Sequence, residues 1–404
     1  MAAHPPGAEM RAAHRHTSRP SHSRRYAIVS DRATQAQYIW EPDSDAWYGP
    51  FATRWDAELT LTRWRAERLR ASRQNVAITA GGAGRQPDAL PSIQTAHVLS
   101  HLTQPREQFH EPYPPAPAPV HYRFADADGV RVFYREAGQP DAPVLLLLHG
   151  FPSSSFQYRH LIPLLAAHFR IIAPDFPGFG FTEVPAERTY AYTFDSLAQT
   201  LGAFVDTLGL ERYALYIFDY GAPTGLRLAV AHPERVTGLI SQNGNAYAEG
   251  LGDAWSPIRA YWADPSAQNR QVVRENVLSF EATRWQYVHG VADPSLVSPE
   301  SYTLDWLLLQ RPGNDEIQLD LFLDYQHNLT QYPTFQAFLR ERQIPALIIW
   351  GQHDPFFIPP GAAAYKRDLP QAVVELLDTG HFALESHAPY IAQRIIEVIG
   401  GAVQ

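Results

Sequence analysis

From residue 119 onward, short unbroken apolar runs alternate with stretches of helical periodicity, and this alternation constrains the fold more than any other feature. The runs include VLLLLHG, FRIIAPD, YALYIFD and ALIIWGQHD. Strands that are apolar on both faces are typical of parallel sheets with helices on each side. We therefore predict an α/β fold with a mostly parallel sheet, in which active groups lie at the carboxyl ends of the strands.

Further segments complete this predicted unit. VTGLISQNG and VVELLD add two strands, and VHYRFAD and VRVFYREAG, joined by ADG, predict an antiparallel hairpin. Between them, residues 247–341 are rich in Trp, Tyr and Leu and helical in pattern, and such a segment is too long for a loop. We predict a helical cap at 247–341, inserted into a core formed by residues 119–246 and 342–404.

The chain before residue 119 divides into three parts by composition. Residues 1–24 are rich in His, Arg, Ser and Pro without periodicity, which predicts a disordered tail. Residues 25–79 contain the strand-like runs RYAIVS, AQYIW and AWYGPF, then a helical pattern and the run NVAITA, which together predict a small α+β accessory unit. Residues 80–118 are rich in Gly and Pro and predict an extended linker.

Charge and cysteine content exclude several classes of protein. The net charge is −9, so the chain as a whole shows no bias toward nucleic acid. Cysteine is absent, which excludes disulfides, thiol catalysis and cysteine-based metal sites. No apolar stretch approaches the ~18 residues of a membrane span, and the N-terminus lacks the apolar core of a secretory signal. We expect a cytoplasmic protein without nucleic acid or membrane partners, and its oligomeric state stays open.

Asp219 stands where the run YALYIFD meets the helical stretch TGLRLAVAH. A strand that turns sharply into a helix raises one side chain at the turn, which is the geometry of a nucleophile elbow. An aspartate before a helix can equally be an N-cap, so this residue alone does not decide between catalysis and structure. Asp354 ends the run ALIIWGQHD, and His381 follows VVELLD. Three such groups at strand ends, in the order nucleophile, acid and histidine, favour a catalytic triad.

Five motifs carry a resemblance to a known family: HGFPSSS, DFPGFGFT, DYGAPTG, GQHDPF and DTGHFALE. In order and spacing they resemble the α/β-hydrolase superfamily, most of all its epoxide hydrolase and haloalkane dehalogenase branch. The resemblance covers roughly residues 120–400. It implies an α/β-hydrolase fold in which the N–H groups of Phe151 and Tyr220 form an oxyanion hole. Ile217 departs from the family, which usually has a small residue two positions before the nucleophile.

An aspartate nucleophile implies a different chemistry from the acyl transfer of a serine. It attacks a saturated carbon and forms an alkyl–enzyme ester, which a water activated by His381 then hydrolyses. Asp354 would orient the imidazole, and the scheme needs no metal or organic cofactor. The aromatic residues of the cap predict an apolar pocket for a small apolar substrate, to which we assign His149, Trp262 and Trp285.

The leaving group separates the two branches of the family. Opening an epoxide produces an alkoxide that needs a proton, and epoxide hydrolases take it from two cap tyrosines. The resemblance places the second tyrosine at Tyr325, in LDYQHN, and the first at Tyr261, in RAYWADP. In a shifted register the first position would fall on Ile258. Both tyrosines could instead simply pack in the cap.

Halide release needs N–H donors instead of a proton. Dehalogenases commonly place a tryptophan directly after the nucleophile, where this chain has Tyr220, and fluoroacetate dehalogenases usually place an arginine there. Trp255, Trp262 or Trp285 could supply one other donor. We therefore predict an epoxide hydrolase, with a haloalkane dehalogenase as the alternative enzyme. The alternative of another class is a non-catalytic ligand-binding protein on the same fold.

Overall fold

The structure is a computed structural model that describes residues 27–30, 37–41, 46–51 and 118–401. The chain divides into two compact units, Met1–Phe109 and His110–Gln404. In the first, β1 (Ala27–Ser30), β2 (Gln37–Glu41) and β3 (Ala46–Phe51) pair as an antiparallel sheet. These strands coincide with the three predicted runs. The predicted tail, the helix and closing strand within 53–79, and nearly all of the linker lie outside the described residues.

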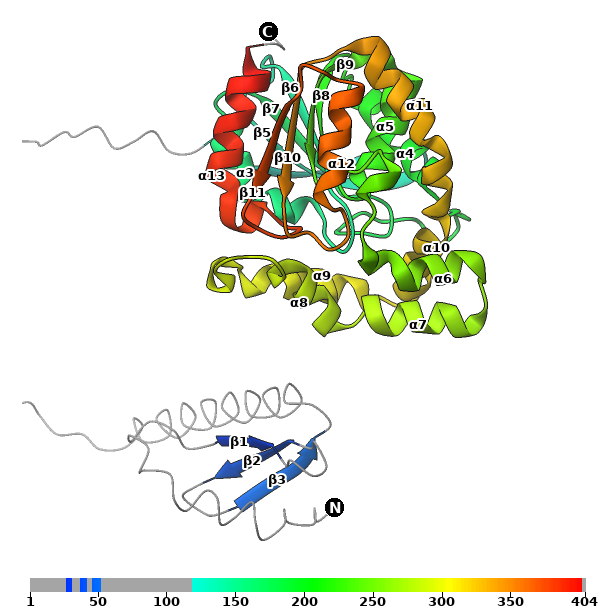
Figure 1. Ribbon diagram of the computed structural model, residues 1–404, viewed down its shortest axis with the longest axis vertical. Coiled ribbons are helices and arrows are strands. Elements are labelled where there is room, and N and C mark those ends of the chain that lie inside the picture. The colour runs from blue at the N-terminus through cyan, green and yellow to red at the C-terminus, as the bar shows by residue number, and fades with distance from the viewer. Residues whose placement is uncertain (1–26, 31–36, 42–45, 52–117, 402–404) are drawn as a thin grey trace, which may run out of the picture. The chain divides into compact units, whose positions relative to one another are not determined.

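The second unit is built on an eight-stranded sheet with the order β11-β10-β9-β8-β6-β7-β5-β4 (Figure 1). The six strands from β11 to β7 run parallel, and the β4–β5 hairpin joins them through an antiparallel pairing of β5 with β7. This confirms the predicted mostly parallel sheet and the hairpin. The strands are β4 (His121–Ala127), β5 (Val130–Ala137), β6 (Val144–Leu148), β7 (Arg170–Pro174), β8 (Tyr213–Phe218), β9 (Val236–Gln242), β10 (Ala346–Gly351) and β11 (Val373–Leu377).

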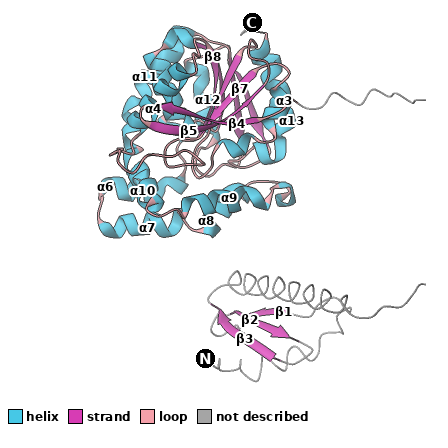
Figure 2. Ribbon diagram, turned by 180° about the vertical axis from the view of Figure 1, so that it is seen from behind, coloured by secondary structure: helices cyan, strands magenta, loops and turns pink. Residues whose placement is uncertain are grey.

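Helices cover both faces of this sheet, as the two views show (Figures 1 and 2). Every residue of β8 and β10 is buried, which is the expected consequence of an unbroken apolar run between two helical layers. One apolar core lies under α3 and α13, and the other under α4, α5 and α12. These helices are α3 (Leu161–Leu165), α4 (Phe194–Thr207), α5 (Gly221–Ala231), α12 (Pro359–Ala364) and α13 (Leu384–Ile395).

Six helices separate β9 from β10: α6 (Ser256–Ala263), α7 (Ala267–Val277), α8 (Phe280–Val288), α9 (Pro299–Leu309), α10 (Asn314–Asp324) and α11 (Gln326–Arg342). Figure 1 shows α6 to α9 as a layer beyond one end of the sheet, while α11 returns along α5. Among the described residues, no helix has both the length and the apolar character needed to cross a membrane.

Candidate active site

Four parallel strands bring the predicted catalytic residues to one edge of the sheet. Phe151 follows β6, Asp219 follows β8, Asp354 follows β10, and His381 follows β11. The carboxyl ends of parallel strands meet at the same edge. The side chains of the three triad candidates therefore converge although 162 positions separate the first from the last, Asp219 from His381.

Asp219 occupies a sharp turn between β8 and α5. Its φ is +47°, in the left-handed region that few non-glycine residues adopt and where strain is typical of functional sites. Two glycines make the turn possible. A Cβ on Gly221 would collide with the carbonyl of Leu148, and one on Gly150 would collide with the Asp219 carboxylate. This is the geometry of a nucleophile elbow.

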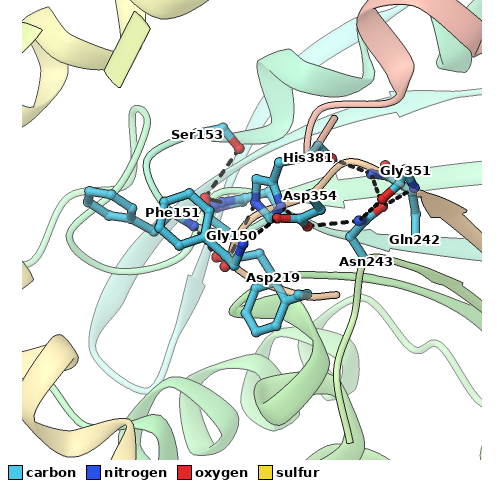
Figure 3. A network of polar contacts seen from close by, with 12 residues as sticks. Gly150, Phe151, Ser153, Asp219, Gln242, Asn243, Gly351, Asp354 and His381 are labelled. Atoms are coloured by element: carbon cyan, nitrogen blue, oxygen red, sulfur yellow. Dashed lines mark hydrogen bonds and ion pairs between the residues drawn. The ribbon is translucent and has the colours of Figure 1, made fainter. Parts of the chain in front are cut away.

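A backbone donor holds one oxygen of the Asp219 carboxylate. The Phe151 N–H donates to Asp219 Oδ1 at 2.5 Å (Figure 3). The Tyr220 N–H lowers the pKa of Asp219 and so also favours the ionised carboxylate. The loop that carries Phe151 is fixed by His149, whose Nε2 accepts from the Phe176 N–H at 2.9 Å. Oδ1 therefore already lies where the oxyanion of a tetrahedral intermediate would form, and Oδ2 is left to face the histidine.

His381 lies between two carboxylates. Its Nδ1 is 2.6 Å from Asp354 Oδ2, and its Nε2 is 4.0 Å from Asp219 Oδ2 (Figure 3). The first contact fixes the ring orientation and places the Nδ1 proton toward Asp354, which leaves Nε2 as the basic nitrogen. That nitrogen faces the carboxylate that would carry the ester.

Burial and charge set the protonation of the pair. Burial raises the pKa of Asp219 to about 6, although His381 and the two backbone N–H groups lower it. For His381, burial acts to lower the pKa, but the charges of Asp354 and Asp219 outweigh it, so that the pKa is raised overall. A raised carboxyl pKa in a closed site is typical of a functional group.

Two residues at the end of β9, which the sequence analysis did not single out, form hydrogen bonds with Asp354 and His381. Asn243 Nδ2 donates to Asp354 Oδ2 at 2.8 Å, while Asn243 Oδ1 accepts from the Gly351 N–H at 2.9 Å (Figure 3). Gln242 Nε2 donates to the His381 carbonyl at 2.8 Å. Their position directly after an apolar run in a parallel sheet was the signal that could have identified them.

A small pocket lies between this edge and the cap helices. Its cavity volume is about 20 Å³, and it reaches both Asp219 and His381. Apart from these two, its lining is apolar or aromatic with one exception, the amide of Gln286; the lining residues are Phe151, Tyr220, Trp255, Ile258, Val277, Gln286, Phe322 and Phe356. This volume is far below the ~300–1,000 Å³ of typical small-molecule sites, so a substrate larger than a water molecule has to move the lining side chains apart.

The three residues assigned to the pocket from sequence do not line it. His149 is completely buried beneath the loop and bonds Phe176. Trp262 turns its indole N–H to the Phe322 carbonyl at 2.7 Å, and Trp285 is 41% exposed. These assignments need correction because an aromatic residue on a cap helix can face the pocket, the cap interior or solvent, and the sequence does not distinguish these faces.

The two cap tyrosines also differ in position. The Tyr261 hydroxyl accepts from Arg270 at 2.6 Å, within a cluster of surface ion pairs, whereas Ile258 lines the pocket. The structure therefore favours the shifted register that the sequence analysis left open. Tyr325 is fully buried behind the pocket, with its ring 4.4 Å from that of Trp255 and 5.8 Å from that of Tyr220. Its hydroxyl has no hydrogen-bond partner of good geometry within residues 118–401.

Comparisons with known proteins identify the family of the chain. Residues 143–388 match the family model described as alpha/beta hydrolase fold. An uncharacterized hydrolase of Saccharomyces cerevisiae is 50% identical over 276 residues, which cover 67% of this chain and 94% of the yeast protein. Haloalkane dehalogenase 2 of Mycobacterium bovis is 30% identical over 296 residues, covering 70% and 96%.

Solved structures share the fold. The crystal structure of the epoxide hydrolase VrEH1 from Vigna radiata superposes with a TM-score of 0.56 at 23% identity. The superposition covers 70% of this chain and 98% of the plant enzyme. At this identity the likeness concerns the fold alone.

Proposed function

Because this chain belongs to the α/β hydrolase family, we propose that it hydrolyses small apolar substrates through a covalent ester on Asp219, with epoxides as the preferred class. The observation that carries the proposal is the carboxylate of Asp219 at a strained elbow, with Oδ1 bound by the Phe151 N–H and Oδ2 facing His381. A carboxylate so placed is suited to attack a saturated carbon.

The first step uses Asp219 Oδ2. Its lone pair forms a bond to the reacting carbon while the bond from that carbon to the leaving group breaks. The pocket gives access to Asp219 from the cap side and is almost entirely apolar, so few water molecules compete for the carboxylate.

The second step uses His381. Its Nε2 takes a proton from a water molecule, which attacks the Asp219 Cγ. Negative charge then develops on Oδ1, which accepts the Phe151 N–H before the reaction begins. The Tyr220 N–H also favours the charged form of the Asp219 carboxyl. Asp354 stabilises the imidazolium that forms.

Two indole groups favour an epoxide over a halide. The Trp255 N–H donates to the Phe356 carbonyl at 3.1 Å, and the Trp262 N–H donates to the Phe322 carbonyl at 2.7 Å. Neither is free to bind a leaving halide, and Trp285 is not part of the pocket lining. Halide release without indole donors lacks the stabilisation that dehalogenases commonly use.

We assign Tyr325 as the proton donor for the alkoxide. Burial raises its pKa well above the usual value of a phenol, so the hydroxyl stays protonated at neutral pH. Transfer to an alkoxide is favourable when the alcohol formed is a weaker acid than this phenol. Tyr261 is not proposed for this role, because its hydroxyl is bound to Arg270.

The alternative activity is haloalkane dehalogenation, which the name of the Mycobacterium bovis relative favours. A binding protein without turnover is the alternative of another class. The domain boundaries and the cytoplasmic location given above stay predictions.

Mass spectrometry of a His381→Gln variant tests the proposal, because loss of the base should trap the ester. Incubation with styrene oxide should add the mass of one substrate molecule, and peptide mapping should place it on Asp219. The Asp219→Asn variant is the matched control and should stay unmodified. Absence of an adduct with every member of a panel of epoxides and haloalkanes would refute the proposal, and release of halide instead of diol by the wild type would favour the alternative activity.

A further inference from the structure

Helix α8 buries three polar side chains, and one of them has no partner. Thr283 donates from its hydroxyl to the Ser279 carbonyl at 3.0 Å, and the Tyr287 hydroxyl donates to Asp305. Gln286 lies between them and is only 4% exposed. Within residues 118–401, its side-chain amide forms no hydrogen bond.

Unlike the hydroxyls of Tyr220 and Tyr325, the Gln286 amide is not fully covered, and its residue lines the pocket. A side-chain amide in this position has hydrogen-bonding capacity that no group within residues 118–401 uses. The unpaired amide is therefore a candidate for a group that acquires its partner only when a ligand binds.

The pocket shows where a ligand would meet this amide. Gln286 lines the same cavity as Asp219 and His381. The other lining groups offer no free donor there: the Trp255 N–H is bound to the Phe356 carbonyl, and the Tyr220 hydroxyl is fully covered, with its ring packed on Phe194. A substrate attacked by Asp219 thus meets one uncommitted N–H donor, on the cap side.

We propose that Gln286 is a catalytic residue that donates a hydrogen bond from Nε2 to the leaving oxygen of the substrate. This inference rests on the proposed function. As Asp219 Oδ2 bonds to the epoxide carbon, the ring C–O bond breaks and its electron pair passes to the oxygen. Gln286 Nε2–H stabilises that charge until the oxygen takes the Tyr325 proton. After hydrolysis, the proton left on the Asp219 carboxyl restores the phenol.

This role assigns a substrate class to the pocket. The reacting carbon must carry a leaving atom that accepts a hydrogen bond, and the rest of the molecule contacts apolar side chains such as Ile258, Val277 and Phe322. An amide donor serves an oxygen or a halide, so the experiment compares both on one carbon skeleton.

The test combines Gln286→Leu with His381→Gln, in which the ester accumulates and its rate of formation can be followed by rapid quenching. With 1,2-epoxyhexane, alkylation of Asp219 should slow by roughly 100- to 1,000-fold, as expected when one donor to developing charge is lost. Gln271→Leu in the same background is the control, because Gln271 is exposed on α7 and pairs with Glu275; it should leave the rate unchanged. If Gln286→Leu fails to fold, Gln286→Met removes the donor with less change of shape.

A second rate separates a chemical role from a structural one. With His381 intact, hydrolysis of the ester should proceed at the wild-type rate in Gln286→Leu, because the leaving oxygen takes no part in that step. If Gln286→Leu slows alkylation by the epoxide alone, the amide donates to a leaving oxygen. If it slows alkylation by 1-bromohexane equally, the amide serves either leaving atom. Either result supports the inference. An unchanged alkylation rate, or equal slowing of both steps, overturns it. An adduct that still forms in the parent variant would leave the proposed function intact, whereas no adduct in that parent would refute the proposed function itself.

Discussion

Lowering the pH should remove the proposed nucleophile within the range in which an ordinary aspartate stays almost fully ionised. In the proposed mechanism, Asp219 attacks only as a carboxylate. Its pKa is about 6 because the side chain is buried, against an unperturbed value of 3.8. A raised carboxyl pKa means that the reactive form is complete above that value and is lost as the pH falls through it.

The expected magnitude follows from the ionised fraction. With a pKa of about 6, roughly nine-tenths of Asp219 is ionised at pH 7 and roughly one-tenth at pH 5, whereas an unperturbed aspartate would still be more than nine-tenths ionised at pH 5. The value of kcat/KM, which reports on the free enzyme, should therefore fall about tenfold between pH 7 and pH 5. Protonation of His381 should not prevent formation of the ester, since the base is needed only for the later hydrolysis of that ester.

The assay is kcat/KM for an epoxide from pH 5 to pH 8, with Asp219→Asn as the blank for uncatalysed ring opening and circular dichroism as the check that the fold persists. A second arm uses Phe322→Ala, which removes a pocket-lining ring that packs 4.8 Å from that of Phe151 and should admit water. Because burial is the main cause of the raised pKa, the midpoint of the profile should move to lower pH in this variant. A flat profile down to pH 5 would refute the reasoning, as would a midpoint near that of a solvated aspartate.

Three further substitutions test other parts of the site. Gly150→Ala places a Cβ against the Asp219 carboxylate and should lower kcat by at least ~100-fold, measured with the epoxide, because small displacements of a nucleophile are costly; an active variant would contradict the described loop. Asn243→Leu leaves Asp354 and the Gly351 N–H each without one partner and should reduce the free energy of unfolding by about 1–3 kcal/mol in urea titrations, together with a loss of turnover; unchanged stability would contradict this. Tyr325→Phe should slow epoxide opening by roughly 10²- to 10⁴-fold, while release of bromide from 1-bromohexane, measured as a control, should not change; equal rates for the epoxide would remove Tyr325 from the mechanism.

The parts of this structure that could be predicted from sequence are those with local signals. Each parallel strand is an unbroken apolar run, and the positions that follow such runs have a fixed place in a parallel sheet. Asp219, Asp354 and His381 were therefore expected to lie together, and the structure places them in contact distance.

The pocket could not be predicted in the same way, because its lining depends on how the cap helices are rotated. On α6, Ile258, Tyr261 and Trp262 lie close in sequence, yet only Ile258 faces the cavity, while Trp262 bonds a backbone carbonyl and Tyr261 bonds an arginine. Gln286 was not predicted either, because it is one of several polar residues in its helix. Only the folded structure shows that it is buried and has no partner among the described residues.

The hydrogen bond from Phe151 to Asp219 Oδ1 has a consequence for the reactions this fold can exclude. In an esterase, the corresponding N–H donors are free to bind the carbonyl oxygen of the substrate. Here the enzyme's own carboxylate accepts the Phe151 N–H in the resting state, so an incoming ester or amide does not find that donor free to polarise its carbonyl. In the proposed mechanism, the same contact that prepares the second half of the reaction thus discriminates against acyl compounds.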